Sequence, residues 1–496
     1  MTSKDVVLSG RLGVGAIIFM VVAAAAPLSV VAALTPIGIL QGNGEGFPAL
    51  FLVITAVMLA FSVGFTTLTP RVADSGGFSS YIRAGFGVPA GTGATFLATA
   101  TYIAMQVGMY AYMGLLISDF LTGQGIPLPW WAVTLLLIAF VGYLGYRNID
   151  FSAKVLGALL VAELVVITIV SFAIIGHGGQ EGISLNSFEP SRVFDGNIGL
   201  GLTFAVSAFL GFESTAVYRD EARDPDRTIP RATFGAVIGV GVVYAFASWA
   251  LVQGWGGKVA DVAAASFQAG DMYQRTAERY VGTWLGLAVS VLLVTSLFAC
   301  ILSFHNVASR YLFTNAHGGT LPSLLGRQNL RHRSPATASI VETVVITVLL
   351  ILLVVLGLDP YADIYTWFAA VGVVGILLLM VVTSAAVVRY FAVAGPEAKG
   401  VGVWRRLFAP GLSGAALLVI FLLVVTNFPV LVGEVDAHGR PSAGPVSATI
   451  LGTVCGCGVL GIGWGVRVQR KRSSTPRAEE VRTTESAPAV PDKAVA

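Results

Sequence analysis

The segment AAAAPLS, residues 23–29, interrupts an apolar run that extends from about residue 12 to about residue 40. Pro27 lacks a backbone N–H, and its ring clashes with the carbonyl four residues earlier, so a regular helix is disturbed there. A second segment, SAFLGFE at residues 207–213, lies inside another apolar run and places a permissive glycine before the ionisable Glu213. Two apolar runs are therefore predicted to lose their helical hydrogen bonds midway.

The composition makes lipid the solvent for much of the chain. Of the 496 residues, 55% are hydrophobic and 11% charged, and the mean hydropathy is +0.80. An average soluble domain has roughly 25% charged residues. In lipid every backbone polar group must be satisfied internally, so apolar runs of about 20 residues are predicted to be helices. The fold class expected is an all-α membrane protein.

Twelve apolar runs are long enough to be transmembrane helices. They cover residues 12–40, 48–69, 88–120, 130–147, 152–176, 196–218, 232–254, 281–310, 336–357, 361–391, 410–431 and 446–467. We expect a short N-terminus at 1–11, five helices in 12–176, five in 196–391, two more in 410–467, and a disordered tail at 468–496.

Basic residues divide unequally between alternate loops. Of the 30 Lys and Arg residues, 25 fall on the side of both termini, and the rest are Arg192, Lys258, Arg275, Arg279 and Arg440. The positive-inside rule then makes both termini cytoplasmic. We expect the membrane to be the cytoplasmic one. The basic residues that follow the last run suit the anionic inner leaflet better than nucleic acid.

Interruptions in corresponding helices of two repeated halves are the best sequence indication of a transporter binding site at the bilayer midplane. Half-helix N-termini offer N–H groups to a carboxylate, and freed carbonyls at half-helix C-termini accept an ammonium group. From spacing alone, a simple kink at Pro27 and close packing at Gly211 explain the two segments equally well.

Three further stretches resemble the amino acid–polyamine–organocation (APC) transporter superfamily. RVADSGGFSSY at 71–81 is similar to its Gly-Gly-aromatic loop. GFES at 211–214 with EARDPDRTIPR at 221–231 is similar to its signature after the sixth helix. NVASRY at 306–311, followed by Leu-Pro at 321–322, is similar to the stretch that ends its eighth helix.

The resemblance implies a LeuT-type inverted repeat of five plus five helices with helices one and six broken, two C-terminal helices, and alternating access. It also implies that the Ala25 carbonyl and the Leu28 and Ser29 amides contact the substrate. From the two interruptions and the third helix together, the predicted substrate-binding residues are Ala25, Ala26, Pro27, Leu28, Ser29, Gln106, Ser207, Ala208, Leu210 and Gly211.

The chain departs from the family pattern at three positions. Pro27-Leu28-Ser29 replaces a Gly-Ser-Gly type break and looks like the Pro-Leu-Thr variant of putrescine importers. Ser207 stands where a gating aromatic is common, so Phe209, Phe212 or Phe204 is predicted to gate. Glu163 stands where many members place a lysine and sodium-driven relatives a sodium ion.

Glu163 and Glu213 are predicted to take part in proton coupling. An intramembrane carboxylate costs about 2.5–3.5 kcal/mol. Glu163 could alternate between protonated and ionised forms, stay protonated as a hydrogen-bond donor to the first helix, or bind sodium. Glu213 could shuttle protons, contact a cationic substrate, or cap the freed backbone, and capping or gating is favoured.

The cytoplasmic stretch from Glu221 to Arg231 suggests, by the resemblance, a gating network of ion pairs, and a solvated loop explains it equally well. Glu342 and His305 also lie in apolar runs, where packing against a polar neighbour is expected.

The function predicted is secondary active transport of a small amine-bearing solute, with amino acid, polyamine, proton symport and uncoupled exchange all open. No nucleotide-binding GxxxxGK[ST] loop, metal motif or enzyme nucleophile motif appears, so no cofactor is expected. A channel would need a continuous polar face, which the apolar runs lack. A sensor built on a carrier fold remains an alternative, and the oligomeric state is open.

Overall fold

The computed structural model describes residues 12–72, 77–147, 153–216, 219, 222–267, 269–329, 334–393 and 400–474. Throughout these ranges the chain is helical apart from turns and isolated β-bridges. Eleven helical stretches in the described ranges are long and apolar enough to cross a membrane. The predicted all-α membrane class is therefore confirmed.

The first of these stretches, Val14–Leu68, has 55 residues. At 1.5 Å per residue it would measure about 80 Å, against about 30 Å for the hydrocarbon core of a bilayer. It is not straight, because Gly42 leaves the helical conformation and Gly44 has φ 57°. Two crossings fit this length, whereas the total of twelve crossings and the inverted repeat stay predictions.

The stretch consists of several elements between its ends. They are α1 (Val14–Ala25), α2 (Pro27–Ser29), the π-helix η1 (Val30–Leu34), α3 (Thr35–Gly38), η2 (Ile39–Asn43), η3 (Gly44–Gly46) and α4 (Phe47–Leu68). The next helices are α5 (Phe78–Phe86), α6 (Val88–Gly123), α7 (Trp130–Arg147), α8 (Ala153–Gly176), η4 (Asn186–Phe188), α9 (Pro190–Val193) and α10 (Ile198–Ser207).

The second half of the chain continues in the same manner. It contains η5 (Phe212–Ala216), α11 (Pro225–Trp255), η7 (Gly256–Lys258), α12 (Val259–Ala265), α13 (Met272–Tyr280), α14 (Thr283–His317), η8 (Ser323–Gly326) and α15 (Ala336–Val355). The last elements are η9 (Pro360–Tyr365), α16 (Thr366–Val393), η11 (Trp404–Phe408), α17 (Ala409–Leu431) and α18 (Pro445–Ser474).

Two boundaries differ clearly from the sequence-based expectation. The seventh helix begins at Pro225 and not near residue 232, because proline is tolerated in the first turn, where its missing N–H has no helical partner. The last helix continues to Ser474, so residues 468–474 are helical and not part of a disordered tail. Arg, Lys and Gln are good helix formers, which explains the extension.

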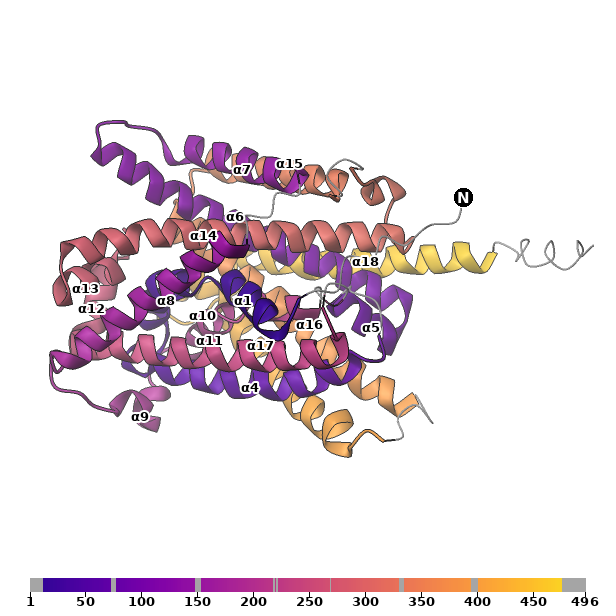
Figure 1. Ribbon diagram of the computed structural model, residues 1–496, viewed down its shortest axis with the longest axis horizontal. Coiled ribbons are helices and arrows are strands. Elements are labelled where there is room, and N and C mark those ends of the chain that lie inside the picture. Colours follow the sequence, from indigo (N-terminus) through magenta and orange to yellow (C-terminus); the bar gives the residue numbers. More distant parts are fainter. Residues whose placement is uncertain are drawn as a thin grey trace, which may run out of the picture.

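The long helices run roughly along one direction (Figure 1). Helix α6 packs against α14, α16 and α18, α4 packs against α11 and α17, and α7 lies beside α15 at the top of the view. We call the end of the bundle that carries α5 the α5 end, and the opposite end, with α12 and α13, the α13 end. Large apolar side chains such as Leu136 and Phe172, 68% and 60% exposed, face outward as lipid-facing residues do.

Candidate functional site

The first helical stretch is interrupted at the predicted segment. Helix α1 ends at Ala25, and Ala26 adopts a left-handed conformation, with φ 46° and ψ 69°, before Pro27 starts α2. In the part of the chain that the structure describes, Ala26 is the only non-glycine residue with positive φ. The left-handed conformation costs an L residue roughly 1–2 kcal/mol. Pro27 is the physical cause of the break, because it has no N–H to donate to the Ala23 carbonyl.

Neighbouring helices satisfy the backbone groups that this break exposes. The Tyr244 hydroxyl of α11 donates to the Ala25 carbonyl at 3.2 Å. Glu163, on α8 and 3% exposed, accepts at Oε2 from the Leu28 amide at 3.3 Å and from the Ser296 hydroxyl of α14 at 2.8 Å. The Leu28 amide, which we expected to contact the substrate, thus has a partner within the protein. Glu163 links the break to both α8 and α14.

A second interruption follows α10, as predicted. The helix ends at Ser207, and the chain turns until the 3-10 helix η5 begins at Phe212, with Gly211 at φ 95°. The fully buried Glu213 accepts from the Gly211 amide at Oε2, 3.1 Å away, and from the Tyr102 hydroxyl of α6 at Oε1. In the structure Glu213 therefore caps freed backbone, which is the role that the sequence favoured.

A small cavity of about 20 Å³ lies between the two interruptions. A water molecule needs about 10–15 Å³ on this measure, so the space holds about one water and the site is nearly closed. The lining residues are Ala25, Ser29, Val30, Leu34, Met105, Gly108, Met109, Ser207, Leu210, Cys300, Phe304, Tyr365 and Ala369. Among the described residues the buried Ser207 hydroxyl has no hydrogen-bond partner, so it is available to a ligand.

The structure separates the predicted substrate-binding residues into three groups. Ala25, Ser29, Ser207 and Leu210 line the cavity. The others lie at or beside the breaks without lining it, namely Ala26, Pro27, Leu28, Ala208 and Gly211. Gln106 donates from Nε2 to Glu342 Oε1 at 2.7 Å and so belongs to a different contact.

Sequence reasoning missed the side chains that give the cavity its apolar walls. On α6 we chose Gln106, whereas the adjacent face, with Met105 and Met109, lines the cavity. The rotation of a helix that is apolar on all sides cannot be read from its pattern, because no polar face marks the solvent side. The lining aromatics are also indistinguishable from core residues in the sequence.

Three tyrosines close the cavity toward the α13 end. Tyr365 lines the cavity, and its ring centroid lies 4.9 Å from that of Tyr112 and 5.5 Å from that of Tyr361. The Tyr361 hydroxyl donates to the Ala33 carbonyl at 3.2 Å, and the Tyr112 hydroxyl donates to the Gly270 carbonyl at 3.2 Å. The stack thus ties α6 and η9 to the first helical stretch and to the loop before α13.

Aromatic rings also close the α5 end. The ring centroid of Phe212 lies 5.9 Å from that of Phe61 and 6.4 Å from that of Phe65. The rings of Phe61 and Phe65 also approach Phe78 at the start of α5. Nearer the surface, Arg219 donates to the Thr69 carbonyl and pairs with Asp226 at 3.2 Å. Aromatic side chains therefore lie between the small cavity and each end of the bundle.

Of the predicted gating residues, Phe212 lies within this closure. Phe209 packs instead against Tyr244, with centroids 6.3 Å apart. Arg231 is exposed on α11, and Glu221 lies outside the described residues. The Arg219–Asp226 ion pair at this end involves an arginine that was not among the predicted gating residues.

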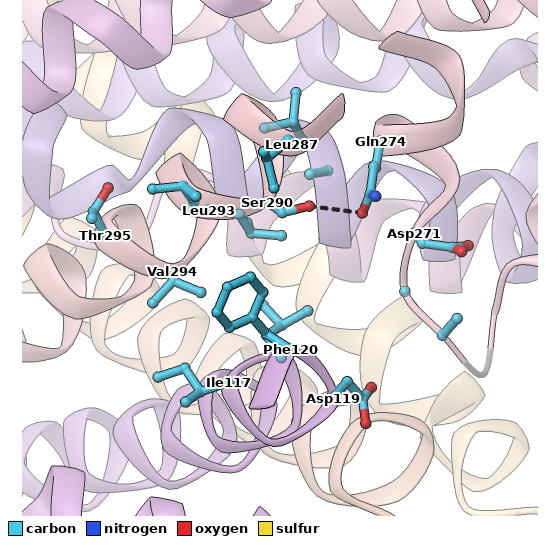
Figure 2. Close-up of a pocket in the computed structure, with 16 residues that line it drawn as sticks. Ile117, Asp119, Phe120, Asp271, Gln274, Leu287, Ser290, Leu293, Val294 and Thr295 are labelled. Carbon is cyan, nitrogen blue, oxygen red and sulfur yellow. Dashed lines mark hydrogen bonds between the residues drawn. The ribbon is translucent and has the colours of Figure 1, made fainter. Parts of the chain in front are cut away.

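A wider groove of about 490 Å³ lies at the outside of the bundle between α6, α13 and α14 (Figure 2). Phe120 and Leu287 on its walls are each 56% exposed, and Ser290 donates to Gln274 at 2.8 Å across it. Ala32 is its one lining residue from the first helical stretch. The groove and the cavity between the two breaks share no lining residue.

The chain is similar in sequence and fold to known transporters. Residues 12–454 match the family model for amino acid permeases. The chain is 26% identical over 207 residues to the branched-chain amino acid permease BcaP of Lactococcus lactis. This match covers 40% of this chain and 42% of BcaP. It is 25% identical over 329 residues to the putrescine transporter PotE of Haemophilus influenzae, and this match covers 61% of this chain and 68% of PotE.

A solved structure extends the likeness to the whole fold. A manganese transporter variant from Eremococcus coleocola superposes with a TM-score of 0.54 at 12% identity, over 95% of this chain and 97% of that one. Among the described residues, no group of three or more His, Cys, Asp or Glu side chains could hold a metal ion. The match to BcaP spans less than half of that relative. The family model covers most of the chain, and the chain belongs to the amino acid permease family.

Proposed function

We propose that this protein is a secondary transporter that moves a small amine-bearing solute across the cytoplasmic membrane by alternating access, with both termini in the cytoplasm. The observation that carries this proposal is the cavity that touches both helix breaks, at Ala25 and Ser207, and is closed toward each end of the bundle. A carrier requires such a site, because opening one closure at a time exposes the same site to either side.

The lining of the cavity favours an amino acid with an apolar side chain. The lining residues include no charged side chain, so the ammonium and carboxylate groups would be held by backbone and by the Ser29 and Ser207 hydroxyls. Met105, Met109 and Phe304 would contact the apolar side chain. A diamine would bring a second ammonium group into this largely apolar lining, where no charged side chain compensates it. The likeness to a putrescine transporter makes a polyamine the second candidate.

Glu163 is the residue that we propose couples transport to protons. Its carboxyl group contacts the first break through Leu28 and α14 through Ser296, so a change in its charge would act on two elements that border the cavity. Glu213 holds the second break in the same way, through Gly211 and Tyr102. Movement at either break would change the hydrogen bonds that stabilise the ionised form.

Counterflow in proteoliposomes tests the proposed function. Vesicles loaded with one unlabelled solute from a panel of neutral amino acids, basic amino acids and diamines are diluted into trace labelled solute. We expect labelled branched or aromatic amino acids to accumulate transiently, and Ser207→Phe, which fills the cavity, to abolish the accumulation. Saturable binding without any flux would support the sensor alternative and contradict transport, and accumulation of diamines alone would overturn the amino acid assignment.

A further inference from the structure

A buried polar cluster connects α6, α14 and α15 away from the cavity. At its centre is Glu342 of α15, which is fully buried. Its Oε1 accepts from Gln106 Nε2 at 2.7 Å, and its Oε2 accepts from the Ser309 hydroxyl at 2.7 Å. His305 Nδ1 lies 3.4 Å from Glu342 Oε1, and the imidazole is 1% exposed.

The imidazole is held in this position from its other side. His305 Nε2 lies 2.8 Å from the Ser339 hydroxyl of α15. Helix α7 passes so close that a Cβ on Gly145 would lie 2.5 Å from Nε2, so a residue without a side chain is required there. In the described structure His305 Nδ1 has no hydrogen-bond partner, although Glu342 is its nearest charged group.

Other ionisable groups near the cluster are few. From α6, Tyr110 interacts electrostatically with Glu342. On α7, Tyr143, Tyr146 and Arg147 are exposed, and on α14 Arg310 is only partly buried. Within Ala336–Val355, Glu342 is the only ionisable residue. Among the described residues, His305 is the one basic side chain that lies within ion-pair distance of Glu342.

Electrostatics then requires the pair to hold a proton. An ionised carboxylate next to a neutral imidazole would leave one uncompensated charge buried between the helices, which is strongly unfavourable. The cluster is neutral with the proton on Glu342 or with the proton on His305, and both arrangements contain the same single proton. We infer that His305 and Glu342 form a proton-binding site, separate from the helix breaks, that exchanges one proton with water during the transport cycle.

Helix α6 connects this site to the second helix break. Tyr102 and Gln106 lie one turn apart, and the former donates to Glu213 while the latter donates to Glu342. Met105 and Met109, on the neighbouring face, line the cavity. When the proton leaves, the charged carboxylate holds Gln106 and Ser309 more tightly. Deprotonation should therefore restrain α6 and slow transport, a consequence that rests on the proposed function.

Proton counting on the purified full chain tests the site without relying on transport. Between about pH 6 and pH 9 ordinary carboxyl groups do not titrate. With an indicator dye, we expect Glu342→Gln to release about one proton fewer than the wild type over this window. The exposed Glu181→Gln should release the same number as the wild type. Equal proton release by wild type and Glu342→Gln would overturn the inference.

A second pair of variants keeps the test valid if Glu342→Gln does not fold. Gly145→Ala keeps both Glu342 and His305 in the sequence but forces the imidazole to move. The pH at which the proton is released should therefore change. Gly239→Ala of α11, where a Cβ meets nothing within 4 Å, is the matched control and should leave the pH of proton release unchanged. An unchanged titration in Gly145→Ala would show that His305 does not share the proton.

Counterflow against pH tests the link to transport. In a Glu163→Gln background, counterflow should fall about tenfold between about pH 6 and pH 9, as expected when a single group titrates. When Glu342→Gln is added, the counterflow rate at every pH in this range should stay within about twofold of the rate at about pH 6. If the fall persists in the double variant, the coupling through α6 is wrong. Absence of any flux in the wild type would contradict the proposed function, and the proton count would still decide on the site.

Discussion

Ala26 carries the strained backbone on which the first break depends, and its side chain is 2% exposed. We expect Ala26→Gly to fold and to remain within about 1 kcal/mol of the wild type, because glycine relieves the left-handed strain and adds chain entropy on unfolding. Ala26→Val should destabilise by on the order of 2 kcal/mol, since a β-branched residue is poorly tolerated at positive φ.

Thermal unfolding of the detergent-purified protein measures both changes. Ala16→Val is the matched control, because Ala16 is exposed on the regular part of α1. Equal midpoints for Ala26→Val and Ala16→Val would mean that the left-handed conformation of Ala26 is not required.

Glu163→Gln removes a titratable group and keeps its shape. Glutamine can still accept from the Leu28 amide and the Ser296 hydroxyl, so the break should persist. We expect uptake driven by a pH gradient to fall at least about tenfold, while counterflow without a gradient persists. Gradient-driven uptake at the wild-type level across pH would rule out proton coupling through Glu163.

At the scale of elements, the tyrosine stack holds the closure of the α13 end. Tyr112→Ala removes ring contacts to Tyr361 and Tyr365, at 4.7 and 4.9 Å, worth about 0.5–1.5 kcal/mol each. Because about 1.4 kcal/mol corresponds to a tenfold change in population, the state that is open at the α13 end should become about tenfold more populated.

Cys300 lines the cavity and reports this opening. In a background with Cys455→Ser and Cys457→Ser, modification of Cys300 by a membrane-impermeant thiol reagent from the α13 end should accelerate about tenfold in Tyr112→Ala. Phe172→Ala, on the lipid-facing surface of α8, should leave the rate unchanged. A Tyr112→Ala rate equal to that of the control would mean that the stack does not gate access.

For the whole molecule, twelve crossings require both termini on the same side of the membrane. In a background in which Cys300, Cys455 and Cys457 are all replaced by serine, Ser474→Cys at the end of α18 should react only from the cytoplasm. His438→Cys, between α17 and α18, should react only from outside. Ser3→Cys should behave like Ser474→Cys. Labelling of residues 3 and 474 from opposite sides would contradict twelve crossings.

Local chemistry sufficed to predict much of this protein. Hydropathy alone separated the membrane helices, because a bilayer admits only apolar segments whose backbone is internally bonded. Pro27 alone located the first break, because the missing N–H and the ring clash act within one turn. Both are properties of neighbouring residues, so they can be read along the chain.

Only the tertiary structure decided which side chains meet. The Leu28 amide and Glu163 are 135 positions apart, and Gln106 and Glu342 are 236 apart. Such contacts depend on how each helix is rotated about its axis, and in helices apolar on every side the sequence does not mark that rotation. For the same reason the cavity lining on α6 and the closing tyrosines emerged only when the helices were packed together.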